Sequence, residues 1–150
     1  MKKHGMGLAL MLALCIAAGA QTPADDVEAV KTAVANFYSA ANYKDLETIL
    51  GYMAPEGYTA FLENDKELFR VDEQNWRDTF KTDWVANFEA IGLEVKVHKD
   101  AALVTGYRVG TLARADEEVF KTMSCLSMMW IRMDGKWRLI HLHVSPIPEE

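Results

Sequence analysis

Apolar residues recur at spacings of three and four from Pro23 onward, which is the spacing of one buried helix face. This face comprises Val27, Val30, Val34, Phe37, Tyr38 and Ala41. Asp25 or Asp26 can cap the helix, because an aspartate oxygen accepts hydrogen bonds from the free N–H groups of a first turn. The pattern therefore predicts a long amphipathic helix that ends near Asn42.

The residues after this helix predict three short elements. A second helix is expected over residues 45–53, because Pro55 cannot continue it. Residues 58–62 alternate well enough for a strand, residues 63–66 have the composition of a turn, and residues 67–71 are expected to be extended.

Large apolar residues, four of them aromatic, then follow at spacings of three and four. Asp72 is a good N-cap residue, and the stripe after it consists of Trp76, Phe80, Trp84, Phe88 and Ile91. Residues four apart lie on one face of a helix. We therefore expect a single helix from Asp72 to a stop at Gly92, lying across a wide core.

After Gly92 the hydrophobic period changes to two, which predicts strands. Residues 93–98 alternate as in a strand with one solvated face. Residues 102–113 form a longer strand that contains Gly106 and Gly110, and glycines at such positions let a strand bend or admit a group close to its backbone.

Two further strands complete the pattern. Residues 115–118 are expected to turn the chain into a strand over residues 119–133. Asp134-Gly135 is a strong two-residue hairpin signal, and the last strand covers residues 137–145. Helices followed by a meander of antiparallel strands predict an α+β domain with its helices on one face of a curved sheet.

The first twenty residues have the composition of a cleavable export signal. Lys2 and Lys3 form a positive start, residues 5–18 are uncharged and mostly apolar, and small residues precede a cleavage point after Ala20. The apolar centre is too short and too rich in Gly and Ala for a transmembrane anchor. We expect a periplasmic or secreted protein whose single mature domain covers residues 21–150 and does not enter a membrane.

Charge narrows the classes of partner. The formal charge of −6 becomes −8 when the signal is removed with its two lysines. An acidic domain without basic clusters excludes nucleic acid and anionic membrane surfaces as partners. Cys125 would be the one cysteine left, so no disulfide within the chain is expected.

Two segments resemble a known family. The stretch AANYKDLETILGYMAPEGY and the ending MMWIRMDGKWRLIHLHVS are similar to the SnoaL-like branch of the nuclear-transport-factor-2-like superfamily. The matching features are Asp45-Leu46, Pro55-Glu56, the Asp-Gly hairpin, and Trp137, His141, His143 and Ser145 of the last strand. The last strand also resembles the association domain of calmodulin-dependent kinase.

The resemblance implies a cone, in which a strongly bent sheet wraps round the first helix and leaves a pocket at the open end. The superfamily contains isomerases, dehydratases, cyclases, binding modules and dimerisation domains, so the fold does not supply the function.

His141 and His143 are candidate catalytic residues. They are two apart on a strand, so both point to one face, which we expect to include Trp137, Leu139 and Ser145. A histidine there could act as a general base near neutral pH. The alternative is a structural role, in hydrogen bonds to neighbouring strands or in a dimer face. A metal site is not expected, because no further Cys, His or Glu cluster has suitable spacing.

Arg108 is the first candidate for binding a ligand. It lies between Gly106 and Gly110 on one face of its strand, and a buried arginine needs a carboxylate or an anionic ligand. In the kinase association domain that this region resembles, the matching strand carries an arginine into the pocket. A surface or dimer salt bridge is the alternative for Arg108.

Aromatic and thioether side chains are candidates for the rest of a pocket wall. The expected lining residues are Tyr38, Tyr58, Trp84, Met128 and Trp130, each of which could equally be core. A buried catalytic carboxylate is missing from the pattern, since the acids fall in turns and on helix surfaces, and Asp83 is the nearest candidate.

The sequence therefore predicts an exported, dimeric SnoaL-like domain that binds a small, partly apolar molecule with an anionic group, without a metal or cofactor. Two alternatives remain open. One is an enzyme of isomerase, dehydratase or hydrolase type that uses His141 or His143 as general base. The other is a pure oligomerisation module.

Overall fold

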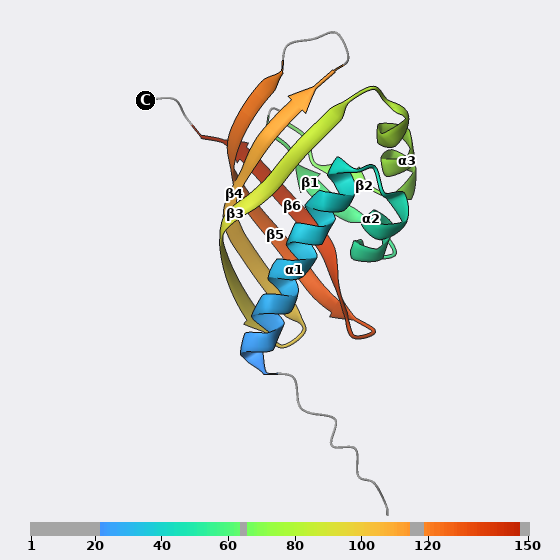
Figure 1. The fold of residues 1–150 in the computed structure, drawn as a ribbon. Coiled ribbons are helices and arrows are strands. Elements are labelled where there is room, and N and C mark those ends of the chain that lie inside the picture. Colours follow the sequence, from blue (N-terminus) through green and yellow to red (C-terminus); the bar gives the residue numbers. More distant parts are fainter. Residues whose placement is uncertain (1–21, 64–65, 115–118, 148–150) are drawn as a thin grey trace, which may run out of the picture.

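The computed structural model describes residues 22–63, 66–114 and 119–147. Three helices precede or interrupt a six-stranded sheet (Figure 1). In chain order the elements are α1 (Pro23–Asn42), α2 (Leu46–Tyr52), β1 (Tyr58–Phe61), β2 (Phe69–Val71), α3 (Glu73–Lys81), β3 (Val85–His98), β4 (Ala101–Ala113), β5 (Phe120–Met133) and β6 (Lys136–Pro146).

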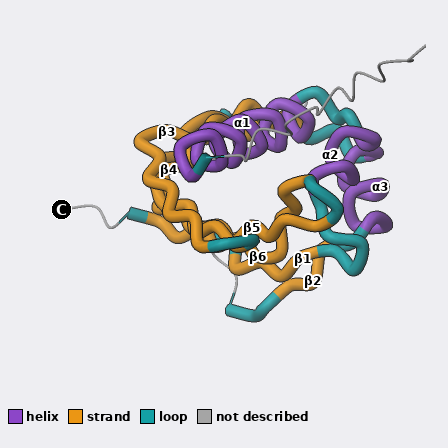
Figure 2. Tube along the Cα trace, turned by 90° about the horizontal axis from the view of Figure 1, so that it is seen from below, coloured by secondary structure: helices purple, strands orange, loops and turns teal. Residues whose placement is uncertain are grey.

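The sheet has the order β2-β1-β6-β5-β4-β3. Only the β1–β6 pair among the named strands is parallel. Seen from one end, the strands curl round one side of α1, with β3 and β4 next to the helix and α2 and α3 on the other side (Figure 2). This is the α+β cone that the sequence predicts.

Local signals determine where α1 begins. The Thr22 hydroxyl accepts a hydrogen bond from the Asp25 backbone N–H, and the Asp25 carboxylate accepts one from the Thr22 backbone N–H. This capping box satisfies two N–H groups that a first turn leaves free. Hydrogen bonds from Thr22 hold the pKa of the Asp25 carboxyl below its usual value. The helix then buries its predicted face towards the sheet.

Phe37 is at the centre of the core, with 2% of its surface exposed. Its ring meets those of Tyr38, Tyr58, Trp76 and Trp130 edge to face, with centroid distances of 5.8 to 6.2 Å. Edge-to-face pairs of this kind add to the stabilisation that burial of apolar surface provides. Phe37 therefore joins α1 to β1, to β5 and to α3.

The predicted helix from Asp72 to Gly92 is wrong in its second half. The helix α3 ends at Lys81, and residues 85–98 form β3, the edge strand next to β4. A spacing of four places side chains on one face of a strand as well as of a helix, because four is a multiple of the strand period. Ala86 and Ala90 complete the alternation with Phe88 on the half-buried face of β3.

A β-bulge in β6 changes the faces of its side chains. Trp130 pairs with Leu139, but Met129 pairs with His141, so Ile140 is the extra residue. An extra residue moves every later side chain to the other face. Leu139 and Leu142 are therefore both buried, whereas His141 and His143 lie on the outer, convex face.

The closed end of the cone is held by an ion pair between α1 and the sheet. Arg132 of β5 binds Asp26 at 2.6 Å, and its guanidinium lies 4.7 Å from the ring centroid of Trp137. The Arg132 backbone N–H donates to the Asp100 carbonyl oxygen at 2.7 Å, in the β3–β4 turn. The first turn of α1 is thereby joined to the far ends of three strands.

Several predictions fall outside the described residues. They are the export signal over residues 1–20 with its cleavage point, the turn at 115–118 and part of the turn at 63–66. Of the helices that the structure describes, none combines the length and the apolar character needed to cross a membrane.

Candidate functional site

The open end of the cone contains a cavity of about 450 Å³. Its wall is built from the C-terminal half of α1, from β1, β2 and α3, and from the parts of β3, β4 and β6 that lie at this end. Eight aromatic side chains line it, namely Phe37, Tyr38, Tyr58, Phe69, Trp76, Phe80, Trp84 and Phe88. An apolar cavity of this size is typical of a site for a small organic molecule.

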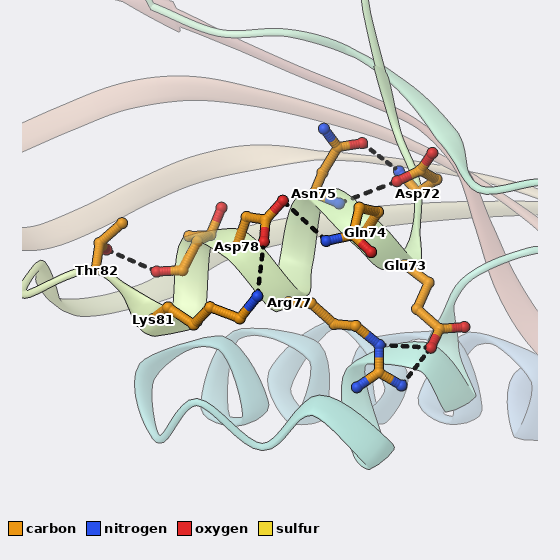
Figure 3. A network of polar contacts seen from close by, with 9 residues as sticks. Asp72, Glu73, Gln74, Asn75, Arg77, Asp78, Lys81 and Thr82 are labelled. Carbon is orange, nitrogen blue, oxygen red and sulfur yellow. Dashed lines mark hydrogen bonds and ion pairs between the residues drawn. The ribbon is translucent and has the colours of Figure 1, made fainter.

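The helix α3 forms one side of this cavity. Several of its polar side chains bond one another within the helix and its N-cap. Asp72 and Asn75 form a capping box, Glu73 binds Arg77, and Asp78 accepts hydrogen bonds from Gln74 and Lys81 (Figure 3).

The apolar side chains of α3 attach it to the rest of the domain. The Trp76 ring lies 6.0 Å from Phe37 and 5.2 Å from Phe80, measured between centroids. The stripe that predicted a longer helix thus gives α3 its inward face.

Arg108 lines the cavity and forms an ion pair with Glu63 on the inner face of the sheet. The distance from Arg108 Nη2 to Glu63 Oε1 is 2.9 Å, and the guanidinium lies 4.4 Å from the ring centroid of Phe88. The same carboxylate oxygen accepts hydrogen bonds from the hydroxyls of Thr122, at 2.9 Å, and Ser124. Arg108 is therefore held by a carboxylate of its own chain and by an aromatic face.

Glu63 is the functional candidate that the sequence pattern missed. It was expected in a turn, and it does follow β1, but its side chain reaches Arg108 and Ser124 on β4 and β5. The contact spans 61 residues of sequence, so no local pattern could reveal it. The one available signal was the buried arginine itself, which needed either a carboxylate or an anionic ligand as its partner.

Tyr38 lines the same cavity, and 5% of its surface is exposed. Its hydroxyl has no hydrogen-bond partner among the residues that the structure describes, and the same holds for Arg108 Nε. Burial raises the pKa of the Tyr38 hydroxyl to about 12, and the nearby positive charge of Arg108 opposes this rise. Trp76 Nε1 is a third buried group of the cavity lining without a hydrogen-bond partner among the described residues, and such groups are rare.

Four of the predicted ligand-binding residues line the cavity, and two do not. Arg108, Tyr38, Tyr58 and Trp84 border it. Trp84 does so from the residue before β3, rather than from the predicted helix. Trp130 and Met128 are buried completely in the core and are not part of the cavity wall, and the rings of Phe37 and Tyr52 pack against Trp130. Burial and the neighbouring Tyr38 raise the pKa of the Tyr58 hydroxyl.

The histidines lie away from the cavity. His141 Nδ1 is 2.7 Å from the Thr59 hydroxyl, and the Phe61 ring packs against His141 and His143 at centroid distances of 6.2 and 5.7 Å. Desolvation and the adjacent His143 hold the pKa of His141 below its usual value. The predicted joint site of Arg108 with His141 is therefore wrong, because the bulge at Ile140 places the two side chains on opposite faces of the sheet.

The profile of the SnoaL-like domain family matches residues 30–149. The chain belongs to this family. No curated protein matches the sequence. The assignment agrees with the geometry, since the matched region contains every strand of the sheet and most of α1.

Solved structures with the same fold cover most of this SnoaL-like domain. A proposed dehydratase of the nuclear-transport-factor-2-like family from Streptomyces avermitilis is 20% identical over 85% of this chain and 100% of its own, with a TM-score of 0.71. A nuclear-transport-factor-2-like protein from Salmonella enterica is 14% identical, over 85% and 95%, with a TM-score of 0.72. The CaMKII hub homology domain of Chlamydomonas reinhardtii is 15% identical, over 82% and 98%, with a TM-score of 0.67.

The outer face of the SnoaL-like domain carries exposed apolar side chains from three strands. They are Phe61 of β1, Leu103 and Tyr107 of β4, and Met123 of β5, each with 37 to 52% of its surface exposed. Cys125 is exposed on the same face. Within the described residues, no group of three or more His, Cys, Asp or Glu side chains is placed to hold a metal ion.

Proposed function

We propose that this SnoaL-like domain is exported and binds a small, mostly apolar molecule in the cavity at the open end of its cone. The observation that carries the proposal is a cavity of about 450 Å³ whose wall is made of aromatic rings and contains Arg108. Rings from several elements can enclose a planar apolar body, and an arginine in the wall can orient its polar end. The export signal predicted over residues 1–20 supports a role outside the cytoplasm.

Binding can be tested with the neutral fluorescent probe N-phenyl-1-naphthylamine. We expect saturable binding at one site per chain, with increased probe emission. Trp84→Ala removes a cavity ring and is expected to weaken binding about tenfold, which corresponds to roughly 1.4 kcal/mol. Tyr43→Ala is the matched control, because Tyr43 is 83% exposed and lies outside this cavity. Absence of saturable binding, or equal affinity in the Trp84 variant, would count against the cavity as the site.

Export can be tested separately by expressing the full chain in a bacterial host. The expected product lies outside the cytoplasm and begins at Gln21. A product that keeps residues 1–20 in the cytoplasm would contradict this part of the proposal.

The exposed outer face favours a second element of the proposal, a homodimer formed through the sheet. Phe61, Leu103, Tyr107 and Met123 would be buried against a second copy, and apolar area of this kind drives stable association. The hub homology domain among the similar structures supports assembly as a use of this fold.

Sedimentation velocity tests the dimer. Met123→Lys is expected to shift the protein to monomers, because it places a charge in the apolar face. Leu68→Lys is the control, since Leu68 is 51% exposed and lies outside β1, β4 and β5. A monomeric wild type, or a dimer unaffected by Met123→Lys, would refute an interface on this face.

A further inference from the structure

We propose that the ligand carries an anionic group, such as a carboxylate, and that Lys44 binds this group at the side of the cavity where α1 ends. This inference rests on the proposed ligand-binding function, and it names both the chemical class of the ligand and a residue that recognises it. The apolar body of such a molecule would lie among the aromatic rings, with its charged end at the lysine ammonium.

The first argument is the charge of the cavity lining, which is opposite to that of the whole chain. The chain has 22 Asp and Glu residues against 16 Lys and Arg residues. Among the described residues that line the cavity, none is Asp or Glu, whereas Lys44, Arg70 and Arg108 are part of the lining. Charges of one sign in a cavity with apolar walls attract ligands of the opposite sign. The lining therefore favours an anion.

The second argument singles out one of these three cations. Glu63 compensates the charge of Arg108 through the 2.9 Å contact to Nη2. Arg70 pairs with Thr59 in the β1–β2 ladder, and the Thr59 hydroxyl bonds a histidine of the outer face. Directly paired residues have their side chains on one face of a sheet, so the side chain of Arg70 leaves β2 towards the outer face. Lys44 is the remaining cation of the lining.

The ammonium of Lys44 is held in place without being neutralised. Its Nζ donates a hydrogen bond to the Thr82 carbonyl oxygen at 2.7 Å, and an ammonium has two further N–H donors. The acids that adjoin Lys44 and Thr82 in the chain have other partners. Asp45 accepts hydrogen bonds in the first turn of α2, and Asp83 pairs with an arginine after β4 at 3.0 Å. Two donors and an uncompensated charge thus remain for a ligand.

The backbone of Lys44 makes its side chain easy to test. Lys44 follows Tyr43, the C-cap of α1, and has a φ of 55°. Glycine is the usual residue at such a position, because a Cβ makes the left-handed conformation costly. Lys99 has the same φ in the turn between β3 and β4, and it does not line the cavity. Replacement of either lysine by glycine therefore removes one positive charge and keeps the backbone favourable.

Two probes with one apolar body test the anion. They are 2-naphthoate and the uncharged ketone 2-acetylnaphthalene, each measured by displacement of N-phenyl-1-naphthylamine at low ionic strength. In the wild type we expect 2-naphthoate to bind about fivefold more tightly than the ketone, because its carboxylate accepts charge-assisted hydrogen bonds. Added salt should reduce this preference, since it screens the charge at the cavity rim.

Two glycine substitutions locate the effect. Lys44→Gly should lower the affinity for 2-naphthoate about tenfold and leave that for the ketone unchanged. Lys99→Gly is the matched control, because it makes the same change of charge at the same φ outside the cavity, and it should alter neither affinity. Both variants should keep the melting temperature of the wild type, so a loss of binding cannot be attributed to unfolding.

The outcomes separate this inference from the function on which it rests. If the fluorescent probe binds but the wild type does not prefer 2-naphthoate to the ketone, the anion is refuted and the cavity remains a binding site. A preference that survives Lys44→Gly, or that falls equally in Lys99→Gly, refutes Lys44 as the residue that binds the anion. If neither the fluorescent probe nor either naphthalene binds, the proposed function fails together with the inference.

Discussion

Arg132 and Arg108 lie on the same inner face of the sheet, at opposite ends of the cone, and they have closely similar surroundings. Each binds a carboxylate, Asp26 at 2.6 Å and Glu63 at 2.9 Å, and each lies over an aromatic ring, that of Trp137 or Phe88. Only Arg108 borders the cavity of about 450 Å³.

The difference lies in where the carboxylate comes from. Asp26 belongs to the first turn of α1, so its bond to Arg132 draws the helix onto the sheet and closes that end. Glu63 follows β1, so its bond to Arg108 joins strand to strand and draws no helix inward. The same set of side chains therefore closes the domain at one end and lines a binding cavity at the other.

Truncation of a tryptophan at each end gives the largest expected contrast. Trp130 is fully buried, so Trp130→Ala should lower the free energy of unfolding by about 3–5 kcal/mol. Trp76 is half-buried on α3, so Trp76→Ala should lower the free energy of unfolding by only about 1–2 kcal/mol. The same variant should bind N-phenyl-1-naphthylamine more weakly, because Trp76 lines the cavity. Urea unfolding measures both losses. Equal losses for the two variants would contradict the division between a closed core and an open binding end.

Neutralising each carboxylate should give a smaller contrast. Asp26 is only 8% exposed, and Asp26→Asn removes the charge that faces Arg132. We therefore expect the free energy of unfolding to fall by about 2–3 kcal/mol. Glu63→Gln should cost about 1 kcal/mol, because the Glu63 side chain is 24% exposed and Arg108 keeps its contact with Phe88. Urea unfolding of both variants provides the measurement. A larger loss for Glu63→Gln would show that the open end carries more of the stability than its cavity suggests.

The smallest expected effect concerns the outer face and its dependence on pH. His141 has a lower pKa in the folded protein than its usual value of 6.5, so the unfolded chain binds the proton more readily. Stability should therefore be highest above pH 6.5 and should fall as the pH drops through 6.5 towards 5. Comparison of urea midpoints at pH 7.5 and 5.0 should show a smaller fall in His141→Gln than in the wild type. An identical fall in both would assign the pH dependence to other groups.

Much of the fold follows from local patterns that the sequence displays. The helix α1 begins at a capping box and buries the predicted stripe, and Asp134-Gly135 joins β5 to β6 as expected. The region from Trp76 to Ile91 was assigned incorrectly, because a spacing of four fits both a helix and a strand. The alternation of Ala86, Phe88 and Ala90 was the available sign of β3.

The candidate site was predicted only where a residue lies on a regular element. Arg108, Tyr38 and Tyr58 were identified because a helix or strand period placed them inward, and they border the cavity. His141 was placed on the wrong face because one extra residue at Ile140 reverses the alternation, and such a bulge leaves no clear signal in a single sequence.

What the sequence by itself determined is the class of the domain: helices first, then long antiparallel strands, with a buried arginine that needed a carboxylate or an anionic ligand. These properties depend on side-chain periods and caps, which act over a few residues. The tertiary structure decided that the carboxylate is Glu63, that Trp130 fills the core while Trp84 lines the cavity, and that the histidines face outward. The physical reason is that these outcomes depend on register and on contacts between residues far apart in the chain, and neither is encoded in any one segment.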